Sequence, residues 1–241
     1  MFKYLLIFLV ILLCPQIYAL DINFLPHWEK EGRISYASSS GNTDDDELSI
    51  RIKVNKPKGN DRFFSDLEYY LESEDGDETE NELTINLRYE HTIRKKLFYF
   101  INGYYKRDEF SGTLSRTYAG PGLGYTLIDT DKHNLQILDS LNYEYESIKE
   151  KPNSSNVNNV LRIIYTYNIY KNIEFSEEFS YDIAFNNTDR YFVDSESSLD
   201  FKINKHLSIV FNYIVEYQNI IPEDEYKHTD KKFLVSLAFK F

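Results

Sequence analysis

Apolar and polar residues alternate with a period of two along much of the chain, and the last segment shows this most clearly. There Lys232, Ser236 and Lys240 lie between apolar neighbours. The apolar positions are Phe233, Val235, Leu237, Phe239 and Phe241. This period predicts a strand with one apolar face. A soluble protein rarely ends on such a strand, because it invites edge pairing, whereas the last strand of a transmembrane barrel closes the ring and faces lipid.

The same alternation predicts twelve strands. We place them at residues 31–38, 46–56, 62–72, 81–92, 97–107, 116–128, 134–147, 157–168, 172–184, 190–203, 206–218 and 230–241. Most are about ten residues or longer, which fits a tilted membrane-spanning strand better than a strand of a soluble domain. The expected fold is therefore all-β, an antiparallel transmembrane β-barrel of about 12 strands.

The connections between these segments are expected to alternate in length. The short ones lie at 57–60, 93–96, 129–133, 169–171 and 204–205. The longer ones lie near 39–45, 73–80, 108–115, 148–156, 185–189 and 219–229, and two of them carry acidic runs. Outer-membrane barrels have short periplasmic turns and longer extracellular loops. With an even strand count, both chain ends are then periplasmic.

The N-terminus has the pattern of a secretory signal. Lys3 precedes the apolar run 4–13, and Ile17-Tyr18-Ala19 is a suitable cleavage site. The run is too short to span a bilayer as a helix. We therefore expect residues 1–19 to be removed and residues 20–241 to form the barrel domain. Cys14 also raises a lipoprotein interpretation, which bulky Leu13 disfavours.

Composition narrows the classes of partner. The chain holds 27 Lys and Arg against 39 Asp and Glu, for a formal charge of −12, which disfavours nucleic-acid binding. Its mean hydropathy of −0.50 disfavours helical membrane spans. The low mean agrees with a barrel, whose strands alternate apolar and polar residues. The expected partners are outer-membrane lipid, lipopolysaccharide and the barrel-assembly machinery, which would engage the terminal strand.

One expected strand breaks a rule of sheets. The segment 120–125 reads Gly-Pro-Gly-Leu-Gly-Tyr, and Pro121 has no N–H for the ladder. One interpretation is a bulge or kink that helps the barrel curve. The other is a glycine stripe that lets a group approach the wall closely.

At these positions the chain resembles a known family. Ser40-Gly41-Asn42-Thr43-Asp44 follows the first expected strand. Asp108, Phe110, Leu114 and Arg116 lead into the glycine-rich segment 120–125. With the terminal apolar strand, this order resembles the salt-induced outer-membrane protein family, domain-of-unknown-function family 481, over about residues 28–241. The resemblance implies a β-barrel in the outer membrane of a Gram-negative bacterium. It implies no activity, ligand or functional residue.

The residues that carry acid–base or metal chemistry form no catalytic pattern. His91, His133 and His206 fall in or beside short turns, His27 precedes the first strand and His228 lies in the last loop. An outer-membrane hydrolase would need a His beside a nucleophilic Ser on the wall. A rim metal site of three distant histidines without cysteine has little support. We predict no enzyme, no metal and no cofactor.

The polar strand faces point into the lumen if the apolar faces meet lipid. Acidic residues are in excess there, especially on the ninth to eleventh strands. The expected pore-lining residues are Glu174, Glu178, Asp182, Asp194, Glu196 and Asp200 together with Arg51, Lys53, Arg88 and Arg162. A twelve-strand ring is intermediate between filled small barrels and open porins. The lumen is then a narrow channel for ions or small solutes with mild cation preference, or a plug of ion pairs in a non-conducting structural or surface-interaction barrel.

Two acidic residues do not fit the alternation. Asp139 and Glu177 fall on the face assigned to lipid. We expect either a register shift at a bulge or a position near a membrane interface. The sequence names neither the solute nor the oligomeric state.

Overall fold

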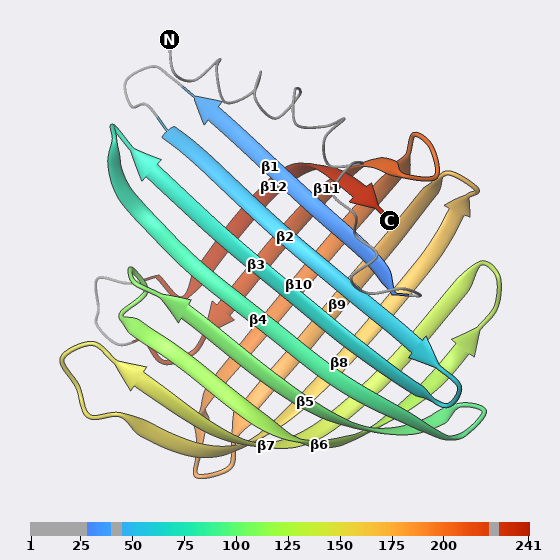
Figure 1. Cartoon of the computed structure of the whole chain (residues 1–241). Helices are drawn as coiled ribbons and strands as arrows, with labels where there is room; N and C mark the ends of the chain where they lie inside the picture. The colour runs from blue at the N-terminus through green and yellow to red at the C-terminus, as the bar shows by residue number, and fades with distance from the viewer. Residues whose placement is uncertain (1–27, 40–44, 222–226) are drawn as a thin grey trace.

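Twelve antiparallel strands close into one barrel in the computed structural model (Figure 1). The structure describes residues 28–39, 45–221 and 227–241. The expected signal peptide and the Ser40–Asp44 motif lie outside this range. The strands are β1 (Glu29–Ser39), β2 (Asp45–Lys58), β3 (Asp61–Glu74), β4 (Asp77–Arg94), β5 (Leu97–Asp108), β6 (Thr113–Asp129), β7 (His133–Ile148), β8 (Ser154–Tyr170), β9 (Ile173–Ala184), β10 (Asn187–Lys202), β11 (Leu207–Gln218) and β12 (Thr229–Lys240).

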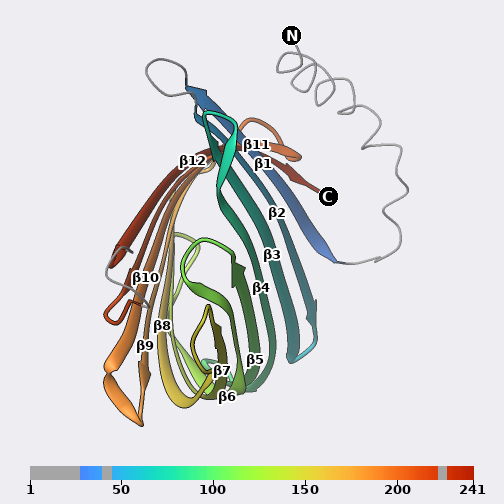
Figure 2. The same ribbon diagram turned by 90° about the vertical axis from the view of Figure 1, so that its left-hand side faces the viewer.

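The fold confirms the predicted class and strand count. Each strand pairs with its neighbours in sequence, and β12 pairs with β1 to close the ring. The start of β1 and the end of β12 lie at the same end, which we call the terminal end; the opposite end is the distal end. In Figure 2, β1 to β5 and β8 to β12 form two sides of the ring, which β6 and β7 join. Within the described residues, no segment forms a helix long and apolar enough to cross a bilayer.

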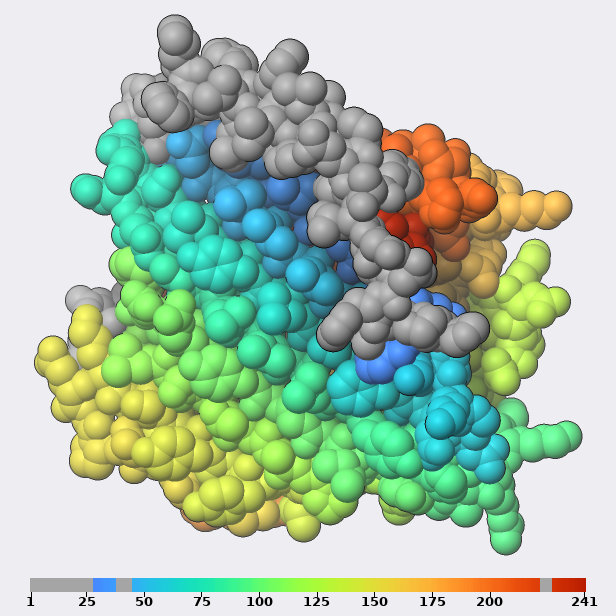
Figure 3. All heavy atoms as spheres, in the orientation of Figure 1, coloured from blue at the N-terminus to red at the C-terminus, as the bar shows by residue number. Residues whose placement is uncertain are grey.

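The alternation sorts side chains between an outer and an inner face. Outward residues remain exposed even though they are apolar, as at Leu123 (58% exposed) and Tyr143 (63% exposed). Inward neighbours are buried although many are polar, as at Asn142 and Glu144. Figure 3 shows the outward side chains of β2 to β6 standing side by side over the wall. An apolar outside around a polar inside is the arrangement of a barrel that meets lipid.

The expected alternation of short and long connections is wrong at two places. Only Asp75 and Gly76 separate β3 from β4, and only residues 185 and 186 separate β9 from β10. Asp75 has φ 51° and Gly76 has φ 91°. Positive φ at both central residues favours Asp-Gly in a tight hairpin, so the acidic run continues the strands instead of forming a loop. The longest connection is 219–228, at the distal end.

Glycines on the inner face of β6 let the wall bend sharply. A Cβ at Gly120 would lie 1.9 Å from the carbonyl oxygen of Leu141, and one at Gly124 would lie 2.1 Å from the Phe98 ring. The β6–β7 ladder omits Gly120 and Pro121 but keeps its register, so no bulge occurs there. Phe98 and Phe100 instead pack against the glycines and Leu138. The glycine stripe therefore admits aromatic rings to the wall.

The two misfit acids do face outward, and the expected register shift is absent there. Asp139 and Glu177 lie in the interior of β7 and β9, in segments without a register shift. Asp139 accepts a hydrogen bond from Asn159 Nδ2 at 2.7 Å. Glu177 accepts one from Ser195 Oγ at 2.6 Å and another from Ser197. Neighbouring polar side chains therefore satisfy these carboxylates.

Candidate functional site: the charged lumen

The lumen holds a cavity of about 820 Å³ that reaches the terminal end of the barrel. Eight of the ten expected pore-lining residues lie on it: Arg51, Lys53, Arg88, Arg162, Glu178, Asp182, Asp194 and Glu196. Glu174 and Asp200 are inward on β9 and β10, in register with one another, but do not line the cavity. Among the described residues, ten basic and ten acidic side chains line the cavity, so its charge is balanced.

Most of the expected acidic residues have cationic partners. Glu174 pairs with Lys202 at 2.8 Å and Asp200 with Lys240 at 2.7 Å. Glu178 lies 3.3 Å from Arg162 and keeps 46% of its side chain exposed to the lumen. Asp194 accepts a hydrogen bond from Ser180 Oγ at 3.0 Å. These acids therefore do not form a bare negative wall.

Arg51 on β2 is the centre of one ion-pair group. Its guanidinium lies 2.7 Å from Asp66, 3.6 Å from Glu68 and 2.7 Å from Glu196. Asp66 and Glu68 are on the neighbouring strand, but Glu196 is on β10, four strands away around the ring. The planar guanidinium suits such multiple carboxylate contacts. Arg51 thus links two walls across the lumen.

Within the described residues, Arg88 and Lys53 each have one ion-pair partner, whereas Arg51 has three. Arg88 Nε lies 2.8 Å from Glu90, and its guanidinium lies 4.5 Å from the centre of the Phe64 ring. Lys53 lies 3.8 Å from Asp66 with a third of its side chain exposed. Both face the large cavity. Lys53 and Glu178 are the more exposed of these charges, at 36% and 46% of their side chains.

A layer of side chains divides the lumen. A second cavity of about 70 Å³ lies toward the distal end, and Tyr104, Arg116, Asp194 and Glu216 line both cavities. Lys106 Nζ donates to Glu216 at 2.9 Å and lies 3.2 Å from Glu82. We call Tyr104, Lys106, Arg116, Asp194 and Glu216 the partition. Strands β5 and β11 are six strands apart in either direction, so the Lys106–Glu216 contact joins opposite walls.

Arg116 anchors the partition on β6. It contacts Asp182, and its Nε donates to Glu144 at 2.6 Å. The guanidinium also lies 3.8 Å from the centre of the Phe192 ring. Arg190 reaches Glu144 at 2.7 Å from β10. Because Glu144 is fully buried, these two cations compensate a carboxylate that would otherwise be costly there.

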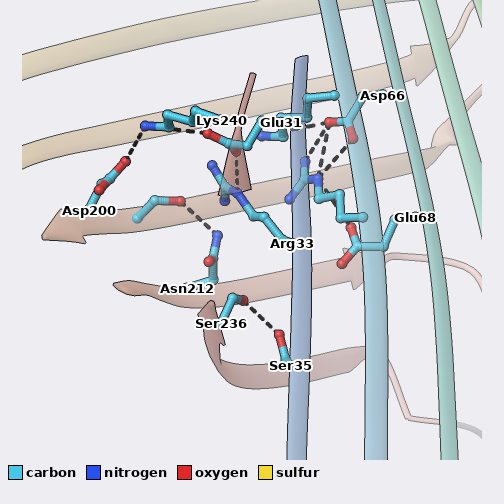
Figure 4. A network of polar contacts seen from close by, with 12 residues as sticks. Glu31, Arg33, Ser35, Asp66, Glu68, Asp200, Asn212, Ser236 and Lys240 are labelled. Atoms are coloured by element: carbon cyan, nitrogen blue, oxygen red, sulfur yellow. Dashed lines mark hydrogen bonds and ion pairs between the residues drawn. The ribbon is translucent and has the colours of Figure 1, made fainter. Parts of the chain in front are cut away.

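The sequence prediction missed several lumen cations, among them Arg116, Arg190, Lys232 and Lys240. The strand alternation could have identified three of them, because residues two apart along a strand point to the same face. Lys232 and Lys240 alternate with the terminal apolar face, and Arg116 is in phase with the inward glycines of β6. Lys240 pairs with Asp200 and lies 3.4 Å from Glu31, beside Arg33 and the Ser35–Ser236 contact (Figure 4).

The terminal apolar residues follow the outer face, as alternation requires, and Phe241 also borders the terminal end of the large cavity. Phe233, Val235, Leu237 and Phe241 are exposed, and Phe239 is partly exposed. The backbone N–H of Phe241 donates to Lys30 O at 2.9 Å, so the last residue joins the seam with β1. These five residues present one apolar surface at the closing strand.

His91, His133 and His206 lie at the strand ends, and of these three only His206 borders the large cavity. His91 contacts Asp61 at 2.7 Å, His133 contacts the Tyr165 hydroxyl at 2.8 Å, and His206 donates to Lys240 O at 3.0 Å. In the described part of the chain, one group of three potential metal ligands occurs, Glu80, Glu82 and Asp108. Lys232 lies 2.5 Å from Glu80 and 3.0 Å from Glu82, so a cation already occupies this group.

Comparison with known proteins agrees with the barrel. A model of the family described as "Protein of unknown function, DUF481" matches residues 32–241, as the resemblance predicted. No curated protein matches the chain. The NanC porin is 12% identical with a TM-score of 0.57, covering 89% of this chain and 100% of that one.

Two further solved structures are similar. The translocator domain of autotransporter NalP from Neisseria meningitidis is 9% identical with a TM-score of 0.51, covering 92% of this chain and 91% of that one. The COG4313 outer membrane channel from Pseudomonas putida F1 is 8% identical with a TM-score of 0.51, covering 88% of this chain and 93% of that one. At these identities the likeness concerns the fold.

Proposed function

We propose that the chain, which belongs to the DUF481 family of proteins of unknown function, is an outer-membrane channel for ions or small solutes that the partition closes in this conformation. The observation that carries the proposal is the cavity of about 820 Å³, separated from the distal cavity by side chains alone. Side chains change rotamer quickly compared with backbone rearrangement. A closure made of side chains is therefore readily reversible.

The orientation in the membrane follows from the outer face and the turns. The apolar outer residues would contact lipid, and the distal end would meet lipopolysaccharide. The terminal end would face the periplasm, after export by the predicted signal at residues 1–19. The barrel-assembly machinery would engage the surface formed by Phe233, Val235, Leu237, Phe239 and Phe241.

The balanced lining supports only a mild preference between ions. Among the expected pore-lining acids that have an ion-pair partner, Glu178 has the longest contact, 3.3 Å to Arg162, and its side chain is 46% exposed. An exposed carboxylate raises the local concentration of cations, and salt screens this effect. We therefore propose mild cation preference that depends mainly on Glu178.

A non-conducting barrel is the second candidate, and the Lys106–Glu216 contact favours it. An ion pair that joins opposite walls is also what a permanent polar plug would contain. We propose no catalytic role, since the described histidines lie beside short turns and in the distal loop, each with a partner of its own.

Planar-bilayer recording of the refolded protein tests the channel proposal. We expect discrete conductance steps that are absent when the same detergent is added without protein. Heat-dependent migration in gels must first confirm that the sample is folded. Folded, inserted protein that never conducts would favour the plugged barrel.

A further inference from the structure

Two arginines that line the large cavity, Arg88 on β4 and Arg162 on β8, have unused hydrogen-bond donors. Arg88 Nε lies 2.8 Å from Glu90 Oε1 without the alignment of a hydrogen bond, so both atoms are buried without a hydrogen-bond partner. Arg162 Nε lies 3.3 Å from Glu178, again as an ion pair only. Arg51, by contrast, donates four hydrogen bonds to carboxylates. Among the described residues, the guanidinium groups of Arg88 and Arg162 donate none.

These two arginines border the same part of the cavity from different walls. Strands β4 and β8 are four strands apart around the ring. Arg88 and Arg162 keep 14% and 20% of their side chains exposed, and the charge of Arg162 is near enough to act on Arg88. The Phe64 ring, 4.5 Å from the Arg88 guanidinium, supports that side chain from the neighbouring strand. Two sets of guanidinium donors therefore face one space.

An accessible carboxylate borders the same space. Glu178 on β9 keeps 46% of its side chain exposed, and its charge also acts on Arg88. Glu90 is only 8% exposed and does not line the cavity. Two guanidinium groups and two carboxylates give this region no net charge. The carboxylates would repel a simple anion and the arginines a simple cation, so the region favours a solute that carries both charges.

We propose that Arg88, Arg162 and Glu178 form a subsite for a small zwitterionic solute, a molecule with one carboxylate and one ammonium group. The carboxylate would accept hydrogen bonds from the two arginines, because the planar guanidinium matches its pair of oxygens. The ammonium would donate to the exposed Glu178. No existing hydrogen bond of the two guanidinium groups has to break. The inference names the solute class of the proposed channel and rests on that channel for the entry of the solute.

Ligand-detected saturation-transfer NMR on the protein in dodecyl maltoside tests the subsite, since this detergent carries no charge that competes for it. The probes are L-alanine, lactate, which has a hydroxyl in place of the ammonium, and isopropylamine, which has a methyl in place of the carboxylate. We expect L-alanine to bind about tenfold more tightly than either, because a hydrogen bond to a charged group contributes about that factor. Lactate or isopropylamine binding as tightly as L-alanine overturns the proposal.

Variants assign the two contacts separately. Glu178→Gln should weaken L-alanine about tenfold and leave lactate no weaker, because only the ammonium partner is lost. Arg88→Lys keeps the positive charge without the planar fork and should also weaken L-alanine. Glu177→Gln removes a carboxylate from the outer face of the same strand and is the matched control. Heat-dependent migration in gels first confirms that each variant is folded. Unchanged L-alanine affinity in Glu178→Gln and Arg88→Lys contradicts the subsite.

Binding in detergent and conduction in a bilayer separate this inference from the proposed channel. L-alanine binding by a protein that never conducts would refute the channel and leave the subsite. Conduction without preferential L-alanine binding would refute the subsite and leave the channel.

Discussion

Lys106 Nζ lies 2.9 Å from a carboxylate oxygen of Glu216, although the two residues belong to strands on opposite sides of the ring. The contact requires the opposite walls to lie close together at this level of the barrel. It places a charged pair between the two cavities. Lys106 also reaches Glu82 at 3.2 Å, so it would keep one partner if Glu216 were lost. A small number of replaceable contacts therefore lies between the two cavities.

The inner glycines of β6 should be intolerant of even one methyl group. Gly124→Ala would place a Cβ 2.1 Å from the Phe98 ring, and overpacking of this kind costs about 1–3 kcal/mol. We expect a lower unfolding midpoint in urea for the protein in lipid vesicles. Phe98→Leu should recover part of the loss in the double variant. Gly103→Ala, where nothing lies within 4 Å, is the control, and an equal loss there would refute the packing argument.

The orientation predicts which turns face the cell exterior. A membrane-impermeant maleimide added to whole cells should label Asp77→Cys at the distal end. Lys58→Cys, equally exposed but at the terminal end, should react only after the cells are broken. The tight Asp75-Gly76 turn makes labelling a better probe than proteolysis. Reaction of Lys58→Cys in intact cells would invert the topology.

Phe241 should matter for assembly more than for the stability of the finished barrel. Its side chain is 40% exposed and borders the terminal end of the large cavity, so Phe241→Ser removes apolar surface from the end of the closing strand. We expect less heat-modifiable protein in the outer membrane of expressing cells. Lys231→Ser, another exposed residue of the same strand, should insert normally. Unchanged insertion of Phe241→Ser would remove the assembly role of the terminal face.

Ion selectivity should respond to Glu178 and not to its neighbour. Glu178→Gln removes a carboxylate that is open to the cavity and leaves Arg162 uncompensated. The reversal potential across a salt gradient should shift toward anions, more so at low ionic strength, because salt screens the lining. Glu177→Gln removes the same charge from the outer face and should leave the reversal potential unchanged. Equal shifts in the two variants would show that Glu178 does not set the preference.

Much of the fold was predictable because barrel strands carry a local signal. Alternation located each strand to within about four residues, and parity assigned Arg51 and Glu196 to the same inner surface. It did not show that these two residues touch. Contacts across a lumen depend on strand tilt and on how the ring flattens, which no single segment encodes.

Two other features were not predicted from the sequence, and each has a physical reason. The Asp75-Gly76 turn is a recognised hairpin signal, but the surrounding acidic run hid it because charged residues also favour loops. The early end of the β1–β12 ladder at Ser35 and Ser236 follows from the shear of the whole barrel. Neither strand alone shows where its partner diverges.

In the proposed channel, side chains alone close the path through the barrel. Single-channel recording of wild type and Glu216→Ala in planar bilayers tests it most directly, with Asp131→Ala in an exposed turn as the matched charge control. We predict that Glu216→Ala conducts at a higher level or opens more often than wild type, because Lys106 retains Glu82 and withdraws from the opposite wall. Asp131→Ala should behave as wild type. Folded Glu216→Ala that conducts no more than wild type would contradict the claim.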